Sequence, residues 1–262
     1  MSAEFPTSAL VAAPERLVLK DGSKAVLKLP VRYGLFLRNG RPALIDTGYT
    51  SRVTEGPRSL ALKLYAGALQ PRLQADGLMA AALAAHRFEP SDVSDVIITH
   101  FHADHVSGLR DLPNARFHAS AAGYERLKRA GALGRLRHGV FFELLPVDFA
   151  DRLTAFEAAR RVEAPLGLGP AADLFGDGSV LAVDLPGHAA GHHGVLFAGD
   201  PPVLYAADAQ WMMAAFDDRA PGLPASLVAE DLAAARDTDG RIRRFREAGG
   251  RVVLCHDPAA LP

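Results

Sequence analysis

The fold of this chain is decided by one stretch of sequence, Thr99-His100-Phe101-His102-Ala103-Asp104-His105. It carries three imidazoles and a carboxylate, and it comes directly after the apolar run at residues 95–98. Imidazole nitrogen and carboxylate oxygen are good ligands for borderline metals, and four of them on one turn can divide between two adjacent cations. Because β-branched residues favour strands, the stretch predicts a rigid strand that presents a metal site at its tip.

The composition of the chain is that of an ordinary soluble globular protein. Its 262 residues can bury a large core, 49% of them are hydrophobic, and the net charge is −1. Near neutrality gives no general attraction to nucleic acid. A modest basic run is interpreted as the solvated face of a helix: Arg126, Lys128, Arg129, Arg135 and Arg137. We expect a small-molecule partner and no nucleic acid.

The sequence also indicates the cellular compartment in which the protein is expected. One cysteine excludes an internal disulfide framework, which fits a reducing environment. No apolar stretch reaches the ~18 residues that a bilayer-spanning helix needs. The first residues, 1–6, show no basic segment followed by an apolar one. We expect a cytoplasmic protein without a membrane partner; a homo-oligomer is compatible with the sequence, which does not define the oligomeric state.

The spacing of apolar residues alternates between strand and helix periods along the chain. Asn39-Gly40 between two apolar runs predicts a tight hairpin. The expected elements are strands within 17–48 and 173–207 and at 251–255, and helices within 58–87, from 104, at 120–129 and at 226–247. No repeat, low-complexity tract or linker interrupts them, so we expect one domain over residues 1–262.

The segment 130–150 has two interpretations. Gly131, Gly134 and Gly139 interrupt it, while residues 141–145 are too apolar for a simple solvated loop. Such a segment suits either a flap over a site or an ordinary helix packed on the core. The pattern alone does not choose between them.

Residues of metal-ligand type follow five apolar runs. These residues are Asp46, His100, His188, Asp208 and His256. If the strands lie in packed sheets with their exits at one edge, the five side chains converge there. Taken alone, a His or Asp at a strand end usually caps a turn, and for Asp46 this interpretation has equal weight.

The full set of candidate ligands predicts a centre for two metals. The first cation would be held by His100, His102 and His188, and the second by Asp104, His105 and His256, with Asp208 bridging. In two-metal hydrolytic sites the ions lie ~3.5–4 Å apart and share a water whose pKa falls toward neutrality. The donor set favours zinc, although iron, manganese or cobalt would also fit. Asp46 would hold a ligand imidazole through its other nitrogen. Cys255 is interpreted as a small buried residue and not as a nucleophile.

On these residues the sequence resembles the metallo-β-lactamase superfamily, from about Tyr33 to Pro258. The superfamily motif H-x-H-x-D-H is intact, and the later His, Asp and His of the family fall at His188, Asp208 and His256. The resemblance implies an α/β protein, a four-layer αββα sandwich with the metals at one edge of the two sheets. The ligand division given above matches that of the family.

Within the superfamily the sequence is most similar to N-acyl-homoserine lactonases. The supporting segments are 44–48, 186–192, 207–209 and 256–258. One position departs: those lactonases commonly have a tyrosine three residues after the bridging aspartate, and here Trp211 stands there. An indole N–H can donate a hydrogen bond but is not a phenol.

The resemblance implies hydrolysis of a small-molecule ester or lactone, with the shared hydroxide as nucleophile and Asp104 as the proton carrier. Trp211, Met212 and Phe216 would either wall an apolar pocket or pack into the core. Several alternatives stay open: an iron-dependent oxidoreductase or dioxygenase, a phosphodiesterase, a glyoxalase II-like thioester hydrolase, or a metal-binding module without turnover.

Overall fold

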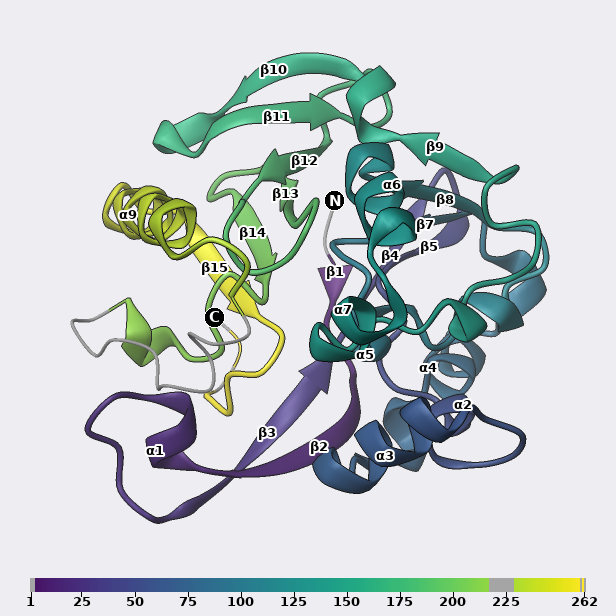
Figure 1. Cartoon of the computed structure of the whole chain (residues 1–262). Helices are drawn as coiled ribbons and strands as arrows, with labels where there is room; N and C mark the ends of the chain where they lie inside the picture. Colours follow the sequence, from purple (N-terminus) through teal and green to yellow (C-terminus); the bar gives the residue numbers. More distant parts are fainter. Residues whose placement is uncertain (1–2, 217–228, 260, 262) are drawn as a thin grey trace.

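The computed structural model describes residues 3–216, 229–259 and 261, and its strands form three sheets (Figure 1). The first sheet has the order β1 (Ala3–Glu4), β4 (Gly34–Arg38), β5 (Arg41–Ile45), β7 (Asp95–Ile97), β8 (Arg116–Ala119), β9 (Leu153–Ala155). The second has the order β10 (Arg160–Ala164), β11 (Gly169–Asp173), β12 (Val180–Asp184), β13 (His193–Phe197), β14 (Val203–Ala207), β15 (Arg251–Leu254). The third has the order β3 (Val26–Arg32), β2 (Thr7–Pro14), β6 (Arg72–Leu73).

Helices surround the sheets (Figure 1). They are α1 (Glu15–Val18), α2 (Ser51–Thr54), α3 (Leu60–Leu69), α4 (Met79–Ala85), α5 (Ala103–Val106), α6 (Ala121–Arg129), α7 (Ala132–Arg137) and α9 (Leu232–Glu247). Helix α9 covers the outer face of the second sheet. In Figure 1, α9 lies outside the second sheet, at the left, and α2, α3 and α4 lie at the opposite side of the molecule. None of the helices in the described part of the chain is both long and apolar enough to cross a membrane.

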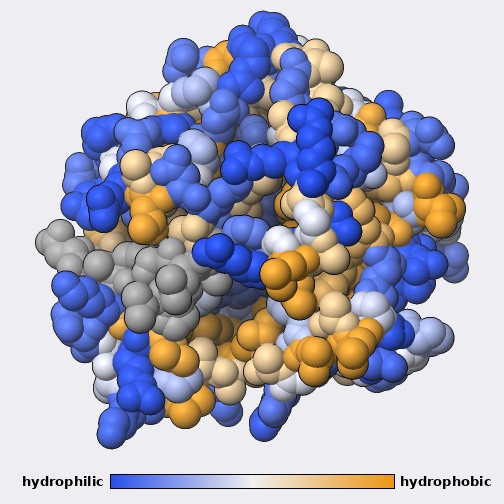
Figure 2. Space-filling view, viewed as in Figure 1, coloured by the Kyte–Doolittle hydropathy of each residue, from blue (hydrophilic) through white to orange (hydrophobic). Residues whose placement is uncertain are grey.

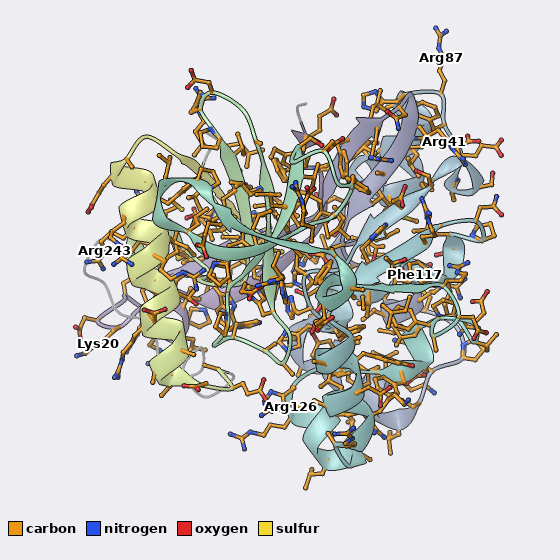
Figure 3. The ribbon with its side chains drawn as sticks, turned by 90° about the horizontal axis from the view of Figure 1, so that it is seen from above. Lys20, Arg41, Arg87, Phe117, Arg126 and Arg243 are labelled. Carbon is orange, nitrogen blue, oxygen red and sulfur yellow. The ribbon has the colours of Figure 1, made fainter. Side chains whose placement is uncertain are left out.

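The hydrophobic core lies mainly between the two large sheets. One cluster of buried side chains joins Val96 and Phe117 of the first sheet to Val195 and Tyr205 of the second. A second cluster packs the other face of the second sheet against α9, where Phe245 is fully buried. Seen from above in Figure 3, Phe117 lies inside the molecule. The expected sandwich of sheets between helices is confirmed.

The sheet topology explains why ligand-type residues meet. The strands β5, β7 and β8 run parallel to one another, and β14 runs parallel to β15. The carboxyl ends of parallel neighbours lie at the same edge of a sheet. The segments that follow β5 and β7 therefore leave the first sheet at one edge, and those that follow β14 and β15 leave the second sheet at one edge. Candidate ligands on these segments lie close together.

The hairpin and most of the helices agree with the sequence predictions. Asn39 and Gly40 join β4 to β5 with φ of 51° and 75°, the left-handed conformations of a tight hairpin turn. Helix α6 begins after Ser120, whose hydroxyl accepts a hydrogen bond from the N–H of Gly123. The helix expected at 226–247 begins at Leu232 within the described residues; residues 226–228 of that expectation lie outside them.

Several strands were not predicted from the sequence. Strand β2 (Thr7–Pro14) was missed, although it pairs with β3 and β6 to build the third sheet. Strands β10 and β11 were also missed; their sequence is short and rich in Ala, Gly and charge. Such segments take their conformation from the neighbours they pair with, because β propensity depends on context.

The segment 130–150 combines a surface helix with an anchored continuation. No residue of α7 (Ala132–Arg137) is buried, whereas Val140, Phe141 and Leu144 belong to the core cluster. The basic run of this region is partly ion-paired: Arg126 pairs with Glu230, and Lys128 with Glu125. Figure 3 shows Arg126 pointing outward from α6.

Candidate metal centre

The first group of candidate ligands gathers around the loop that follows β7. Ligand atoms of four buried residues all lie within 4.8 Å of one another, and these residues are His100, His102, His188 and Asp208. His188 comes from the loop after β12, and its Nε2 lies 3.2 Å from Nδ1 of His102 and 3.5 Å from Oδ2 of Asp208. The three imidazoles expected at one cation therefore do meet.

A second group lies on the other side of Asp208. Its four ligand atoms, again within 4.8 Å of one another, come from Asp104, His105, Cys255 and His256. Oδ2 of Asp104 lies 3.6 Å from Nε2 of His105 and 3.4 Å from Nε2 of His256. Cys255 was not expected in this group; its thiol is fully buried and also donates to the carbonyl oxygen of Arg32 at 3.3 Å.

Asp208 lies between the two groups. One of its oxygens, Oδ1, is 3.5 Å from Nε2 of His105, and the other, Oδ2, is 3.5 Å from Nε2 of His188. Oδ2 is also 3.2 Å from Nε2 of His256. A carboxylate whose oxygens face both groups has the position that a bridging ligand requires.

Buried polar atoms without a partner show that the site suits cations. In the described part of the chain, the atoms Nε2 of His100, His102 and His105 and Oδ1 of Asp208 are buried and accept or donate no hydrogen bond. Buried polar atoms are almost always satisfied in native proteins, so a cluster of exceptions needs an explanation. Lone pairs turned toward a common point fit metal ions, and the nitrogen-rich set with carboxylates suits zinc.

The outer atoms of the ligands are held by fixed partners. Oδ2 of Asp46 lies 2.8 Å from Nδ1 of His105, and the same carboxylate accepts bonds from the N–H and hydroxyl of Thr99, each at 2.8 Å. Nδ1 of His256 donates to the carbonyl oxygen of Pro30 at 2.9 Å. Such bonds fix the ring orientation and leave the inner nitrogen free for a metal.

The backbone turns sharply at two positions beside the ligands. Asp46 has φ of 59° and Ala207, directly before Asp208, has φ of 46°. The left-handed region is unfavourable for residues other than glycine. At Ala207 the pairing of β14 with β15 also shifts register, which ends the strand and redirects the chain toward the site.

Burial and neighbouring charges shift the pKa values of the candidate ligands in opposite directions. Burial lowers the pKa of His100 and of His188 well below 6.5, so both rings are neutral, as metal ligation requires. At His105 and His256 burial also favours the neutral ring, but the surrounding carboxylates outweigh it and raise the pKa well above 6.5. Burial disfavours ionisation of Asp208, yet His256 and His105 prevail and hold its pKa well below 3.8.

A cavity of about 460 Å³ is lined by five of the candidate ligands: His102, Asp104, His188, Asp208 and His256. We call the ligand floor the seven residues His100, His102, Asp104, His105, His188, Asp208 and His256. We call the apolar wall the aliphatic side chains of β2, β3 and α3 that line the cavity, namely Val11, Ala12, Ala13, Pro14, Leu29, Ala68 and Leu69. Figure 2 shows hydrophobic residues gathered on the lower half of this face, over these elements.

The three residues expected to wall a pocket lie in different places. Trp211 lines the large cavity, and its ring packs edge-on against His256 at 6.1 Å between centroids. Met212 lines a separate cavity of about 40 Å³. Phe216 is 1% exposed and packs in the core with α9, so it does not reach the large cavity.

Sequence reasoning missed two tyrosines and the apolar wall. Tyr49 and Tyr65 line the same cavity as the ligand floor, and their hydroxyl oxygens lie 2.9 Å apart. Tyr49 follows the segment 44–48 by one residue, a proximity that could have drawn attention to it. Tyr65 falls within a helix of ordinary period, and nothing in the local pattern distinguishes it.

Comparisons with known proteins agree with this geometry. The family model described as the metallo-β-lactamase superfamily matches residues 28–246. The N-acyl homoserine lactonase AttM of Azorhizobium caulinodans is 27% identical over an alignment of 263 positions that covers 93% of this chain and 88% of the relative. A solved N-acyl homoserine lactone hydrolase, with N-hexanoyl-L-homoserine at its catalytic metal centre, superposes with a TM-score of 0.70 at 18% identity, over 98% of this chain and 93% of that chain. AidC, a dizinc quorum-quenching lactonase, gives a TM-score of 0.68 at 15% identity, over 98% and 87%.

Proposed function

Because the chain belongs to the metallo-β-lactamase superfamily, we propose that it is a two-metal hydrolase that opens the ester bond of a small-molecule lactone, such as an N-acyl homoserine lactone. One observation carries the proposal: two groups of buried ligand atoms meet at Asp208 on the floor of a largely apolar cavity. The lactonase names of the relatives support the same substrate class.

The residue roles follow from the two groups. His100, His102 and His188 would hold one cation and Asp104, His105 and His256 the other, with Asp208 shared. The cations, zinc by the donor set, would supply hydroxide at neutral pH and polarise the substrate carbonyl. Cys255 lies beside the second group and is free and buried, which suits a reducing compartment such as the cytoplasm.

Asp104 is the group of this chain that would carry the proton. Its carboxylate lines the cavity, and although burial disfavours its charge, His105 and His256 hold its pKa below 3.8. It is therefore ionised before the reaction and can accept the proton released when hydroxide adds to the carbonyl carbon. When the ester C–O bond breaks, the same proton goes to the departing alkoxide.

The apolar wall suits an acyl chain. Val11, Leu29 and Leu69 face the cavity from three different elements, so an alkyl chain lying there would be covered on several sides. Each buried methylene contributes about 0.8 kcal/mol, enough to prefer an acylated lactone over a bare one.

A panel of substrates on metal-defined protein tests the proposal. We expect two zinc ions per chain by elemental analysis and the fastest turnover on acyl lactones. S-lactoylglutathione as the best substrate would instead show a thioester hydrolase, and bis-p-nitrophenyl phosphate a phosphodiesterase. One iron per chain with oxygen uptake would show an oxidoreductase. Any of these three results, or no turnover at all, would reject the lactonase assignment.

A further inference from the structure

Two phenols stand over the ligand floor. Tyr49 lies in the loop after β5 and Tyr65 on α3 (Leu60–Leu69), and both line the cavity that also contains Asp104, His188 and His256. Their hydroxyl oxygens are 2.9 Å apart, a normal hydrogen bond in which geometry alone allows either to donate. The roles of the two hydroxyls depend on where each proton points.

The burial of the two rings settles the direction of this bond. Tyr49 is 1% exposed, and the only hydrogen bond of its hydroxyl within the described residues is the one to Tyr65. A buried donor without an acceptor costs about 1–3 kcal/mol. Tyr49 therefore donates to Tyr65, which accepts. Tyr65 is half-buried, and its own hydroxyl proton is free to point into the cavity. Because the Tyr65 oxygen accepts a hydrogen bond from Tyr49, its O–H group becomes a stronger donor.

Both phenols keep their protons and their positions. Burial, together with the negative charge of Asp104, raises the pKa of Tyr49 and of Tyr65 far above neutrality. The Tyr65 ring packs against Phe141 with centroids 5.0 Å apart. It also lies so close to Gly139 that an added Cβ there would meet Cε2 of Tyr65 at 3.1 Å. The backbone N–H of Tyr49 is bonded to the hydroxyl of Ser8 at 2.9 Å.

We propose that Tyr65 is a catalytic residue whose hydroxyl donates a hydrogen bond to the carbonyl oxygen of the scissile ester, with Tyr49 as its positioning residue. This inference rests on the proposed lactone hydrolysis. When hydroxide bonds to the carbonyl carbon, the π electron pair moves to that oxygen, and the Tyr65 proton stabilises the negative charge without being transferred. When the tetrahedral centre collapses, the carbonyl re-forms and the bond to the ring oxygen breaks.

Few other side chains of the cavity can perform this task. Apart from the ligand floor and the two phenols, the cavity-lining side chains with N–H donors in the described residues are Arg137, His138 and Trp211. Trp211 presents its ring to His256. A preorganised donor aimed at a developing oxyanion contributes about 10²–10³ in kcat, so its loss is readily measured.

The substitution Tyr65→Phe removes the hydroxyl and keeps the ring. We expect kcat on an acyl lactone to fall about 100-fold, with KM within about threefold and bound metal unchanged. Tyr49→Phe should lower kcat about tenfold, and the double variant should match Tyr65→Phe alone, since Tyr49 acts only through Tyr65. Tyr124→Phe, a phenol that packs on Phe101 away from the cavity, is the matched control and should equal wild type.

A binding measurement separates the role of the hydroxyl from a role in folding. Calorimetry with the ring-opened product N-hexanoyl-homoserine should show about tenfold weaker binding to Tyr65→Phe, because the product carboxylate loses the same donor, while thermal stability stays near wild type. Wild-type kcat in Tyr65→Phe, a change in KM alone, or a larger loss in Trp211→Phe would overturn the inference. If wild type itself does not hydrolyse lactones, the proposed function fails first.

Discussion

The ligand floor and the apolar wall are two regions of one cavity built on different principles. On the floor, polar atoms are buried, fixed by outer partners such as Asp46, and turned toward common points. On the wall, side chains such as Leu29 and Ala68 offer shape and apolar surface without directed bonds. Under the proposed function, the ligand floor would supply the chemistry, and the apolar wall would select which molecules bind.

The largest expected effect comes from removing one floor ligand. In His102→Ala the first group loses an imidazole whose Nδ1 lies 3.2 Å from Nε2 of His188, so we expect lactone turnover to fall at least about 10³-fold, more than the 10–100-fold typical of outer partners. Bound metal, measured by elemental analysis, should fall as well. His86→Ala, which removes a surface imidazole paired with Glu4, is the matched control. Full metal content with full turnover in His102→Ala would remove the basis for the floor as a metal site.

A second substitution removes an interaction that orients a floor residue, without removing any residue of the ligand floor. Asp46→Asn keeps the size of the side chain but removes the charge that lies 2.8 Å from Nδ1 of His105. We expect metal affinity, measured by competition with a chelator, to fall about 10–100-fold. Unchanged affinity would show that Thr99 and the backbone alone orient the His105 ring.

A change in the wall should alter selectivity and spare the chemistry. Ala68→Phe places a bulky ring on the cavity side of α3, so we expect KM for a long-chain acyl lactone to rise about tenfold, with kcat for a short-chain lactone unchanged. Leu64→Phe on the same helix is the control, because Leu64 is 62% exposed and does not line the cavity. Equal effects of both substitutions on long and short chains would place the acyl chain elsewhere.

The last prediction is the most modest and concerns how the free energy of unfolding depends on pH through Asp239, a carboxyl group on α9. Burial raises the pKa of Asp239 on α9 to about 6, although a bond of 2.8 Å from Gln210 opposes the shift. The carboxyl group of Asp239 has a pKa near 3.8 in the unfolded chain and near 6 in the folded protein. The stability that this group contributes is therefore present at low pH and is lost as the pH rises from about 4 to 6. The full shift would correspond to about 3 kcal/mol. Because Asp239 is only partly buried, solvent screening reduces this, and Asp239→Asn should match wild type at pH 4 and gain ~1–2 kcal/mol above pH 7.

Thermal unfolding across this pH range checks that expectation. The gain corresponds to roughly 2–8 °C in Tm for a chain of this size. A constant difference between Asp239→Asn and wild type at pH 4 and pH 8 would mean that the carboxyl is not the group that titrates.

The floor could be predicted from the sequence, and the wall could not. The candidate ligands are rare residue types in dense local spacing, and each later one follows an apolar run. Parallel pairing brings the ends of β5 and β7 to one sheet edge and the ends of β14 and β15 to another. His188 follows β12, which pairs antiparallel with both of its neighbours. The wall comes from β2 (Thr7–Pro14) and α3, where Val, Ala and Leu are as common as in any core. Their position at a cavity results from the three-dimensional arrangement of the third sheet.

The same reasoning explains the individual misses. Cys255 was interpreted as a buried residue, which it is, but its distance from Asp104 depends on where β15 lies relative to the loop after β7. Tyr65 gains its position only because α3 packs on Phe141, 76 residues further along the chain. Phe216 follows Asp208 closely in sequence, yet its side chain packs in the core with residues of α9.

The left-handed backbone at Asp46 and Ala207 has a consequence for any attempt to make this protein more heat-resistant. This conformation costs about 1–2 kcal/mol at a residue such as Ala207 and less at Asp46, because a short polar side chain tolerates it better, and the packed sheets behind the two turns offset the cost. Selection for thermal tolerance alone would favour substitutions that relax these two turns. Variants obtained in that way would hold Asp208 and His105 less accurately, and a gain in melting temperature would come together with a loss of bound ions.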